Sequence, residues 1–417
     1  MIVHTAGVQM RILLSEGSGL TSRQVATRLG DLGHHVELLS ATRVCLTRFT
    51  RHVHKLHLVP HFGREPFAWL EAASAIAKAQ SIDVLFPTHE QVAVLSARQH
   101  TLNVATVVPP FQSLRRVQDK ISAFRTLQEV GVPQPESVVA KSVDDLTGVA
   151  TFPVFVKRAI STASSGVRRA SSSAELQVAA SALGLGPSEL LIQCQASGPL
   201  AMVQAVADNG RLVAHHANLR IREGVGGGAS LKESVALPSL TEPLENLIDT
   251  LHWHGPLSMD VIVTPQGPLA IDVNPRLVEP MNAFLAGVDL VAAMLDLARS
   301  AHPAVQSPGK TGIRSCQVLL AVLGAAQHRG SRIDIALELV HALGRRGEFA
   351  GAVEELTPIS GDPIAGVPVI LAAASTLVWP PLWRTFHAGA VGPYALTPEG
   401  WNELLSAHDT VNANGRR

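Results

Sequence analysis

The chain has 417 residues, of which 46% are hydrophobic and 16% charged, so it can build sizeable cores in about two to four domains. Basic and acidic residues balance at 34 each. This balance excludes a strongly basic surface, so we expect no nucleic-acid partner. The cysteines Cys45, Cys194 and Cys316 lie far apart and form no CxxC pair, which favours reduced thiols and a cytoplasmic location.

Residues 1–112 alternate strand and helix signals. An apolar run at 11–17, which ends in a glycine, precedes a helical pattern at 21–33, for which Thr21 or Ser22 is the expected N-cap and Gly33 the stop. A second strand is expected at 34–40, a helix at 66–81 and a third strand at 82–88. Such alternation predicts a parallel, doubly wound sheet in an α/β, Rossmann-like domain.

The loop "EGSGLTS" after the first strand suggests a dinucleotide-binding enzyme. It lacks the full GxGxxG spacing, and no acidic residue ends the second strand, "HHVELLS". An NAD-dependent enzyme is therefore the least favoured of the alternatives.

The segment "LSMDVIVTPQGPLAIDVNPR" predicts a hairpin that carries carboxylates. A three-residue loop ending at Gly267 would pair Thr264 with Pro268 and place Asp260 opposite Asp272. Asn274 would share their face, while Leu269, Ile271 and Val273 would pack on the other.

Opposed carboxylates repel each other unless a cation lies between them. Oxygen ligands of this kind suit Mg²⁺ that also binds phosphates. Two other interpretations stay open: one aspartate could be protonated, or the register could slip by one residue.

Several cationic side chains stand at unusual places for a soluble fold. Lys157 lies in the apolar strand "FPVFVKR", and Lys120 begins a helix, where a cation is unfavourable without an anion. Arg220 and Arg222 alternate on one strand and would face the same way, and Arg276 closes the hairpin. Together with the carboxylates these cations suit an anionic nucleotide with a metal ion, although Lys157 alone could be an edge lysine that reaches solvent.

The order of these motifs resembles the ATP-grasp superfamily, closest to its carboxylate–amine ligases and the carbamoyl-phosphate-synthase-like branch. The matching pieces lie between about residues 113 and 300: "DK" at 119–120, "FPVFVKR", "STASSGV", "LIQCQASG", "LRIREGVGGGASLKES", "SMDVIV" and "IDVNPR". The resemblance implies a pre-ATP-grasp domain at 1–112, a small α+β subdomain at 113–195 and a large subdomain with the metal site at 196–305. A mainly helical region of unknown role would follow at 306–417.

The resemblance also implies roles for individual residues. Lys120, Lys157 and Lys232 would contact the nucleotide, Ser164, Ser165 and Gly166 would cover its phosphates, and Gln193, Cys194, Gln195 and Ala196 would present backbone groups to adenine. Asp260, Asp272 and Asn274 would bind one or two Mg²⁺, or Mn²⁺ in its place. Arg276 would stabilise the transferred phosphoryl group, and Arg220 and Arg222 would hold the acyl phosphate or the substrate carboxylate.

Two positions depart from the family pattern. Members often have glutamate where Asp272 stands, and an acidic residue is common at the hinge where this chain has Gln193, Cys194 and Gln195. The first departure bears on metal spacing and the second on adenine and ribose binding.

The expected function is ATP- and Mg²⁺-dependent ligation of a small-molecule carboxylate to an amine, by a homodimer or a monomer. The alternative is a catalytically degenerate nucleotide-binding scaffold or a membrane-associated regulatory module, because residues 364–383 carry no charge over their whole length. This segment contains three prolines, so we expect a buried or interfacial segment rather than a membrane span.

Overall fold

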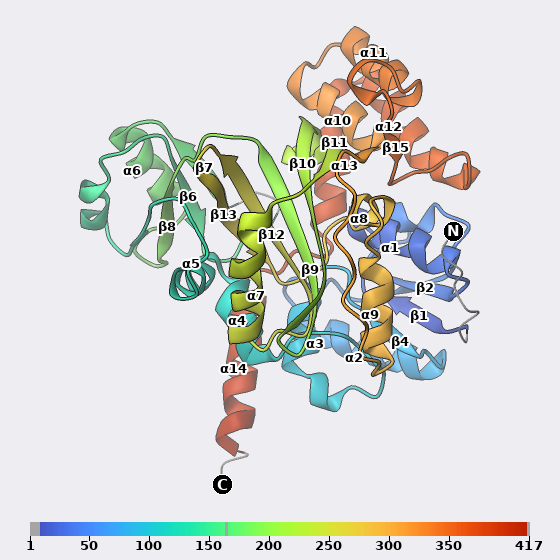
Figure 1. Cartoon of the computed structure of the whole chain (residues 1–417), viewed down its shortest axis with the longest axis horizontal. Helices are drawn as coiled ribbons and strands as arrows, with labels where there is room; N and C mark the ends of the chain where they lie inside the picture. The colour runs from blue at the N-terminus through green and yellow to red at the C-terminus, as the bar shows by residue number, and fades with distance from the viewer. Residues whose placement is uncertain (1–8, 163–165, 415–417) are drawn as a thin grey trace.

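A computed structural model describes residues 9–162 and 166–414, with side chains up to residue 410. Figure 1 shows three sheets that lie across the molecule. The N-terminal sheet (blue) is on the right, a large sheet is in the centre, and a small sheet is on the left. Most of the C-terminal helices gather above the large sheet, whereas the last helix extends below it.

The N-terminal sheet is parallel and has the order β3-β2-β1-β4, which confirms the predicted doubly wound architecture. Helix α1 packs on one face and helices α2 and α3 on the other, because β1 and β2 alternate their apolar side chains between two cores. The elements are β1 (Arg11–Leu14), α1 (Leu20–Asp31), β2 (His35–Ser40), β3 (Val53–Leu58), α2 (Pro66–Ala79), β4 (Val84–Phe86) and α3 (Val92–Ala97).

The start of helix α1 differs from the expectation. Gly19 is the N-cap, and Thr21 and Ser22 lie inside the first turn, so the predicted cap was wrong. The Glu16 carboxylate instead accepts hydrogen bonds from the backbone N–H groups of Ser18 (2.5 Å) and Gly19 (2.9 Å). A side chain from the preceding loop thus satisfies groups just before the helix, which a search for Ser or Thr caps does not find.

The small sheet is antiparallel with the order β5-β8-β6-β7, and two helices connect it to the N-terminal domain. Helix α5 begins as expected: the Asp119 side chain accepts from two backbone N–H groups, and Gly131 follows its end with a φ of 76°. The elements are α4 (Phe111–Gln118), α5 (Lys120–Glu129), β5 (Ser137–Ala140), β6 (Val154–Arg158), β7 (Val167–Ala170), α6 (Ser173–Ala182) and β8 (Leu190–Cys194).

The large sheet has seven strands in the order β13-β12-β9-β10-β11-β14-β15. Its last two strands come from beyond residue 305, where the sequence placed a domain boundary. The elements are β9 (Leu200–Asp208), β10 (Arg211–Glu223), β11 (Ala229–Val235), α7 (Thr241–Thr250), β12 (Gly255–Thr264), β13 (Gly267–Asn274), α8 (Met281–Leu285), α9 (Leu290–Ala298), β14 (Arg314–Cys316) and β15 (Val353–Glu354). The Asn209–Gly210 turn joins β9 and β10 with a positive φ at both residues, as its sequence predicts.

The two faces of the large sheet differ in chemistry. One face is apolar and packs against helices α4, α5 and α7. On the other face, cross-strand partners form polar rows, for example Asn274, Ser258, Gln204 and His216 in one row. The N-terminal domain docks against this polar side, where Gln24 on α1 accepts from the backbone N–H of Met281 at 3.0 Å.

The C-terminal region is mainly helical, as expected, and packs against β11 and β14 through its own apolar core. Within the described residues, no helix is both long and apolar enough to cross a membrane. The uncharged segment 364–383 contains the 13-residue helix α12 flanked by short turns of 3₁₀ helix, and only one side of α12 is buried. The helices are α10 (Val318–His328), α11 (Arg332–Leu343), α12 (Gly366–Val378), α13 (Trp383–Val391) and α14 (Pro398–Asn414).

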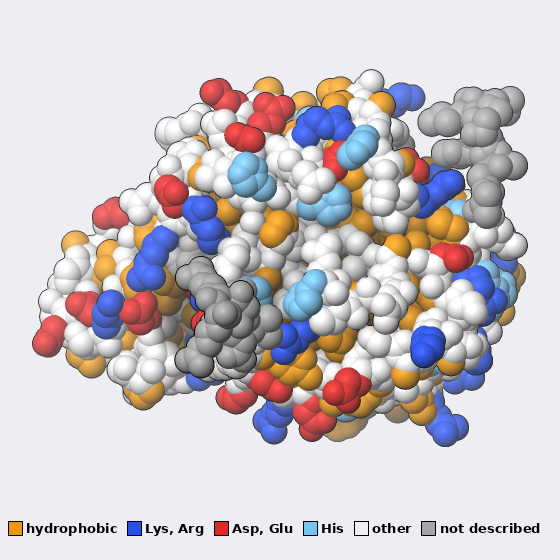
Figure 2. Space-filling view, turned by 90° about the horizontal axis from the view of Figure 1, so that it is seen from below, with side chains coloured by type: hydrophobic (Ala, Val, Ile, Leu, Met, Phe, Trp, Pro, Cys, Tyr) orange, Lys and Arg blue, Asp and Glu red, His pale blue; other side chains and the backbone are white. Residues whose placement is uncertain are grey.

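The surface carries charges of both signs. On the face shown in Figure 2, basic and acidic side chains are interspersed with hydrophobic ones, in keeping with the equal totals of 34.

Candidate nucleotide and metal site

The carboxylate hairpin brings Asp260 opposite Asp272, but not by the predicted register. The turn has two residues, so Thr264 pairs with Gly267 and not with Pro268. A β-bulge at Ile271 then shifts the ladder by one residue and restores the pairing of the two aspartates. Because of the bulge, Ala270 and Val273 enter the core, whereas Leu269 and Ile271 are only partly buried.

Lys120 lies directly on the hairpin carboxylate. Its Nζ is 2.7 Å from both Oδ1 and Oδ2 of Asp272, so the cation at the start of α5 has the anion that such a position requires. The two residues are 152 positions apart, and the contact joins the linker helix to the large sheet.

Lys157 reaches the same hairpin from the small sheet. Its Nζ donates to Gln193 Oε1 and to the carbonyl oxygen of Ile271, both at 2.7 Å. The acceptor on the hairpin is Ile271, the bulged residue, which has no partner in the regular pairing of β12 with β13. Lys157 is buried with only neutral hydrogen-bond partners, and burial lowers its pKa to about 8.

The two carboxylates have opposite electrostatic environments. Burial, and then the charge of Asp272, raise the pKa of Asp260 to about 6. Burial alone would also raise the pKa of Asp272, but Lys120 and Lys157 hold it below its ordinary value. A second negative charge on the pair is therefore unfavourable below about pH 6, and a divalent cation would relieve the repulsion.

The donor set matches a metal ion that shares its ligands with phosphate. Among residues 9–162 and 166–414 no group of three or more His, Cys, Asp or Glu side chains is placed to hold a metal ion. Two carboxylates and the amide of Asn274 would leave several positions for phosphate oxygens and water, as Mg²⁺ prefers. A small cavity beside this group is lined by Lys120, Phe124, Gln193, Ile271 and Asp272, with others.

The strand predicted to meet adenine runs along the small sheet next to this cavity. Gln193 and Cys194 pair with β6, and the Gln195 side chain accepts from Arg169 at 2.9 Å. Two backbone N–H groups of this segment already have partners: that of Cys194 donates to the carbonyl oxygen of Glu136, and that of Gln195 to the carbonyl oxygen of Pro153. Ala196 follows the end of β8, and its role stays a prediction.

The predicted phosphate-covering loop is only partly described. Gly166 is buried, and a Cβ atom there would lie 2.4 Å from the side chain of Ser161, so the position requires glycine. Ser164 and Ser165 lie outside the described residues.

Arg220 and Arg222 do not share one environment, because a second bulge lies between them. Arg220 donates to the carbonyl oxygen of Gly227 at 2.6 Å and pairs with Glu223 at 3.2 Å. Arg222 pairs with Glu338 at 2.6 Å and with Glu348, both in the C-terminal region. Neither arginine is in contact with the hairpin aspartates among the described contacts.

Lys232 is placed differently from Lys120 and Lys157. Its side chain is 2% exposed and lies between Glu279 and Glu355, with a distance of 2.6 Å to Glu355. Burial alone would lower its pKa, but the two carboxylates raise it to about 12. Gln317 also donates to both glutamates, so the two carboxylates that contact this cation are held in place inside the protein.

Arg276 ends the hairpin without a carboxylate partner. In the described part of the chain its side chain has one hydrogen bond, at 3.4 Å to Asn274 Oδ1, and no ion pair. Its guanidinium is close enough to act on Asp260, on His89 and on Tyr394.

Several polar residues were not expected from the sequence: Glu16, His89, Glu279, Glu355 and Tyr394. The charge of Arg276 acts on two of them, His89 and Tyr394. A signal was present for two of them. Glu16 and His89 follow buried strands β1 and β4, at the carboxyl ends where ligands of parallel sheets bind.

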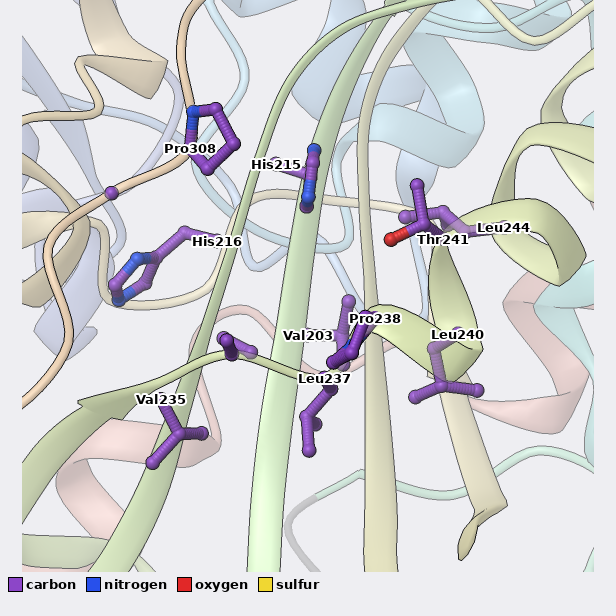
Figure 3. A pocket seen from close by; sticks show the side chains of 13 residues that line it. Val203, His215, His216, Val235, Leu237, Pro238, Leu240, Thr241, Leu244 and Pro308 are labelled. Atoms are coloured by element: carbon purple, nitrogen blue, oxygen red, sulfur yellow. The ribbon is translucent and has the colours of Figure 1, made fainter.

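A separate cavity of about 200 Å³ lies elsewhere in the molecule. Figure 3 shows Val203, His215 and Val235 around it together with Leu240, Thr241 and Leu244 from the α7 region. It is mostly apolar and opens on the face of the sheet that packs against α7, so it is not part of the hairpin site.

Comparisons with known proteins agree with this architecture. No family model matches the chain, and no curated protein matches it in sequence. Among solved structures, a biotin carboxylase complex with β,γ-ATP from Campylobacter jejuni is 17% identical, with a TM-score of 0.60 over 74% of this chain and 75% of the other. A carboxyaminoimidazole ribonucleotide synthase from Aspergillus clavatus, complexed with ATP, is 15% identical, with a TM-score of 0.57 over 74% and 82%.

A third similar structure contains metal and nucleotide. The biotin carboxylase domain of the Hydrogenobacter thermophilus 2-oxoglutarate carboxylase, in complex with MgADP, ADP and bicarbonate, is 17% identical, with a TM-score of 0.59 over 74% and 75%. At these identities the likeness concerns the fold. The chain has the fold of the ATP-grasp enzymes, as the order of its motifs indicated.

Proposed function

We propose that this chain is an ATP- and Mg²⁺-dependent ligase that activates a carboxylate as an acyl phosphate for attack by an amine. The observation that carries the proposal is the hairpin itself: two opposed aspartates, approached by Lys120 from a linker helix and by Lys157 from the small sheet. Three parts of the fold meet there around groups that suit phosphate and a divalent cation.

Each group has a task in this proposal. Lys120 and Lys157 bind the phosphates, and Asp260, Asp272 and Asn274 hold the metal ion. Mg²⁺ neutralises phosphate charge when it is bound. Arg276 supplies positive charge beside the transferred phosphoryl group, where preorganised charge lowers the barrier most.

The reaction has two steps. A substrate carboxylate oxygen forms a bond to the γ-phosphorus as the bond between that phosphorus and the bridging oxygen breaks, and ADP leaves. The amine then attacks the acyl carbon, inorganic phosphate leaves, and the nitrogen loses a proton. No side-chain nucleophile is required, so positioning and charge account for the catalysis.

The contacts of the two lysines also support the proposal. Lys120 lies on Asp272, and Lys157 lies on neutral carbonyl groups. Phosphate oxygens would give Lys157 the anionic partner that it lacks, and a metal ion would take the place of Lys120 beside Asp272.

Thermal unfolding tests the proposal. A ligand that binds only the folded state raises the midpoint, so ATP and Mg²⁺ together should raise it more than either alone. Asp272→Asn should weaken that rise, whereas Glu403→Gln, on the exposed side of α14, should leave it unchanged. No rise at millimolar ATP with Mg²⁺ would contradict both the ligase and a scaffold that binds nucleotide.

A further inference from the structure

The cavity of about 200 Å³ lies where strand β10 extends past the end of β11. Ala217 and Val235 form the last pair of the two strands, and His215 and His216 lie beyond it on β10. After Val235 the chain leaves the sheet towards α7, and the segment at 308–309 lines the cavity from another direction. The cavity therefore exists because a strand of 13 residues lies beside one of 7.

The walls of the cavity are apolar and uncharged. Figure 3 shows Val203, Leu240 and Leu244 around it, and no Asp, Glu, Lys or Arg is among the described residues that line it. Its two histidines are neutral, because burial lowers the pKa of His215 and lowers that of His216 to about 4. A charged molecule would leave water here without gaining a counter-charge, so the cavity favours a neutral one.

The hydrogen bonds of Asn282 determine which nitrogen of His216 carries the proton. The Nδ2 atom of Asn282 donates to Ser315 Oγ at 2.7 Å and to the carbonyl oxygen of Ile313 at 3.3 Å. Its Oδ1 atom is thus the one that lies 2.8 Å from His216 Nε2, and this oxygen can only accept. Nε2 therefore carries the proton, and Nδ1 of the neutral ring is an acceptor that has no donor in the described part of the chain.

The free acceptor of His216 faces Gly309, which also lines the cavity. A Cβ atom built at Gly309 would lie 3.3 Å from Nδ1, and the same atom would lie 3.2 Å from the side chain of Val288. Glycine at this position therefore keeps the approach to Nδ1 open. A buried acceptor without a donor costs stability, and a hydroxyl or N–H group that entered the cavity would remove that cost.

We propose that this cavity binds a small neutral molecule with an apolar body the size of one aromatic ring and a hydroxyl or N–H group that donates to His216 Nδ1. Phenols and indoles have this combination of groups. The space of about 200 Å³ is sufficient, since engineered apolar cavities of about 150 Å³ bind benzene. The cavity is separate from the hairpin, and this inference does not depend on the proposed ligase function.

Three matched probes test the proposal by thermal unfolding of the full chain without nucleotide. The probe 4-methylphenol has both the ring and the donor, 4-methylanisole replaces the donor by a methyl ether, and 4-methylbenzoate adds a charge. At millimolar concentration 4-methylphenol should raise the midpoint by about 1–2 °C, and the other two should raise it clearly less. Saturation-transfer nuclear magnetic resonance should rank the three probes in the same order.

Two variants locate the binding site. Gly309→Ala places a methyl group against Nδ1 of His216, and Val235→Phe fills part of the cavity with a ring, so both should lose the response to 4-methylphenol. The matched controls are Gly148→Ala, where a Cβ atom meets nothing within 4 Å, and Val138→Phe, on an exposed position of β5. Both controls should respond as the wild type does.

The midpoint of each variant without probe shows whether it folds. Val235→Phe should keep or raise this midpoint, because it fills empty space, whereas Gly309→Ala should lower it slightly because its neighbours must move. If one variant fails to fold, the other decides.

Three outcomes would overturn the inference. No rise with either 4-methylphenol or indole would show that the cavity does not bind this class of molecule. Equal rises with 4-methylphenol and 4-methylanisole would remove the role of His216 Nδ1. An equal response in the wild type and Val235→Phe would place the binding elsewhere. Because no nucleotide is present, none of these results bears on the ligase proposal, which has its own test.

Discussion

Two buried lysines of the molecule have opposite surroundings. Lys232 lies between Glu279 and Glu355, with every polar contact made inside the protein and a pKa raised to about 12. Lys157 lies against two neutral carbonyl oxygens, and its pKa is lowered to about 8. Both are cations removed from water, yet only one of them has an anion in contact.

The difference separates a structural cation from one that is available to a ligand. A buried cation with two carboxylates gains nothing from an incoming anion, whereas one with neutral partners gains a full ion pair. The same contrast applies to arginines: Arg222 is paired twice, and Arg276 has no ion pair among the described residues. Two cations without a carboxylate in contact, Lys157 and Arg276, thus lie at the hairpin beside the Lys120–Asp272 ion pair, where we place the substrates.

The largest effect should come from removing the hairpin groups that we propose to bind the metal ion. We expect the double variant Asp272→Ala, Asn274→Ala to lower ADP formation by about a hundredfold or more, since transition-state charge would lose its stabilisation. ADP release by a coupled assay measures this, with Glu403→Ala as the control. Turnover close to that of the control would show that the hairpin does not hold the metal.

Removing Lys232 should damage the fold more than the nucleotide site. Lys232→Met would leave Glu279 and Glu355 buried without a cation, so we expect a loss of about 3–5 kcal/mol in the free energy of unfolding. Urea unfolding measures it. The triple variant Lys232→Met, Glu279→Gln, Glu355→Gln should recover part of the loss, because it leaves no buried charge; no recovery would contradict this account.

The same substitution at Lys157 should affect nucleotide binding more than it affects stability. Lys157→Met removes a cation whose partners are neutral, so the free energy of unfolding should change by only about 1 kcal/mol. The midpoint shift produced by MgATP should be lost. The comparison fails if Lys157→Met destabilises the protein as strongly as Lys232→Met, or if it leaves the MgATP shift intact.

The smallest effect is a pH dependence of metal binding. Asp260 has a pKa raised to about 6, and a metal ion requires its ionised form, so Mn²⁺ affinity should rise as pH increases towards 6 and level off above it. Below pH 6 the affinity should fall by about tenfold per unit. Titration of Mn²⁺ by electron paramagnetic resonance tests this, and Asp260→Asn should remove the dependence.

The stability of the metal-free protein should depend on pH in the opposite direction to its metal affinity. The folded chain keeps the Asp260 proton that the unfolded chain releases between its ordinary pKa of 3.8 and about 6, so the contribution of this group to stability falls as pH rises through that window. Metal-free protein should show this trend, and a saturating metal ion should reverse it.

Local pattern was enough to predict three of the four strands of the N-terminal sheet and the opposed aspartates of the hairpin, but not β3 or the length of the hairpin turn. The apolar runs there alternate with helical periods, and Asp260, Asp272 and Asn274 belong to neighbouring strands of one hairpin. Spacing along a strand then determines which side chains share a face. Even so, the two bulges were not predictable, because a bulge leaves no fixed mark in the residue pattern.

Contacts between distant segments could not be predicted. Glu355, which contacts Lys232, is 123 positions from it along the chain. It belongs to the C-terminal region, where the sequence matched no known pattern. Arg222 was likewise expected beside the substrate, yet its partners Glu338 and Glu348 come from that same region. The domain boundaries at 112, 195 and 305, and the role of each site residue, stay predictions.

The bulge at Ile271 has a consequence for how this hairpin can change in length. The aspartates would face each other either with a three-residue turn and regular strands or, as here, with a two-residue turn and one extra residue in β13. The odd residue can thus move between turn and strand while the carboxylates keep their place. Deleting the bulged residue would leave a two-residue turn with regular strands and would still pair the two aspartates, so the bulge can absorb a change of one residue. A change of one residue that neither the turn nor the bulge absorbs would turn Asp272 and Asn274 towards the apolar core. Natural or designed relatives of this hairpin can therefore differ by one residue in length, provided that a bulge is gained or lost with it.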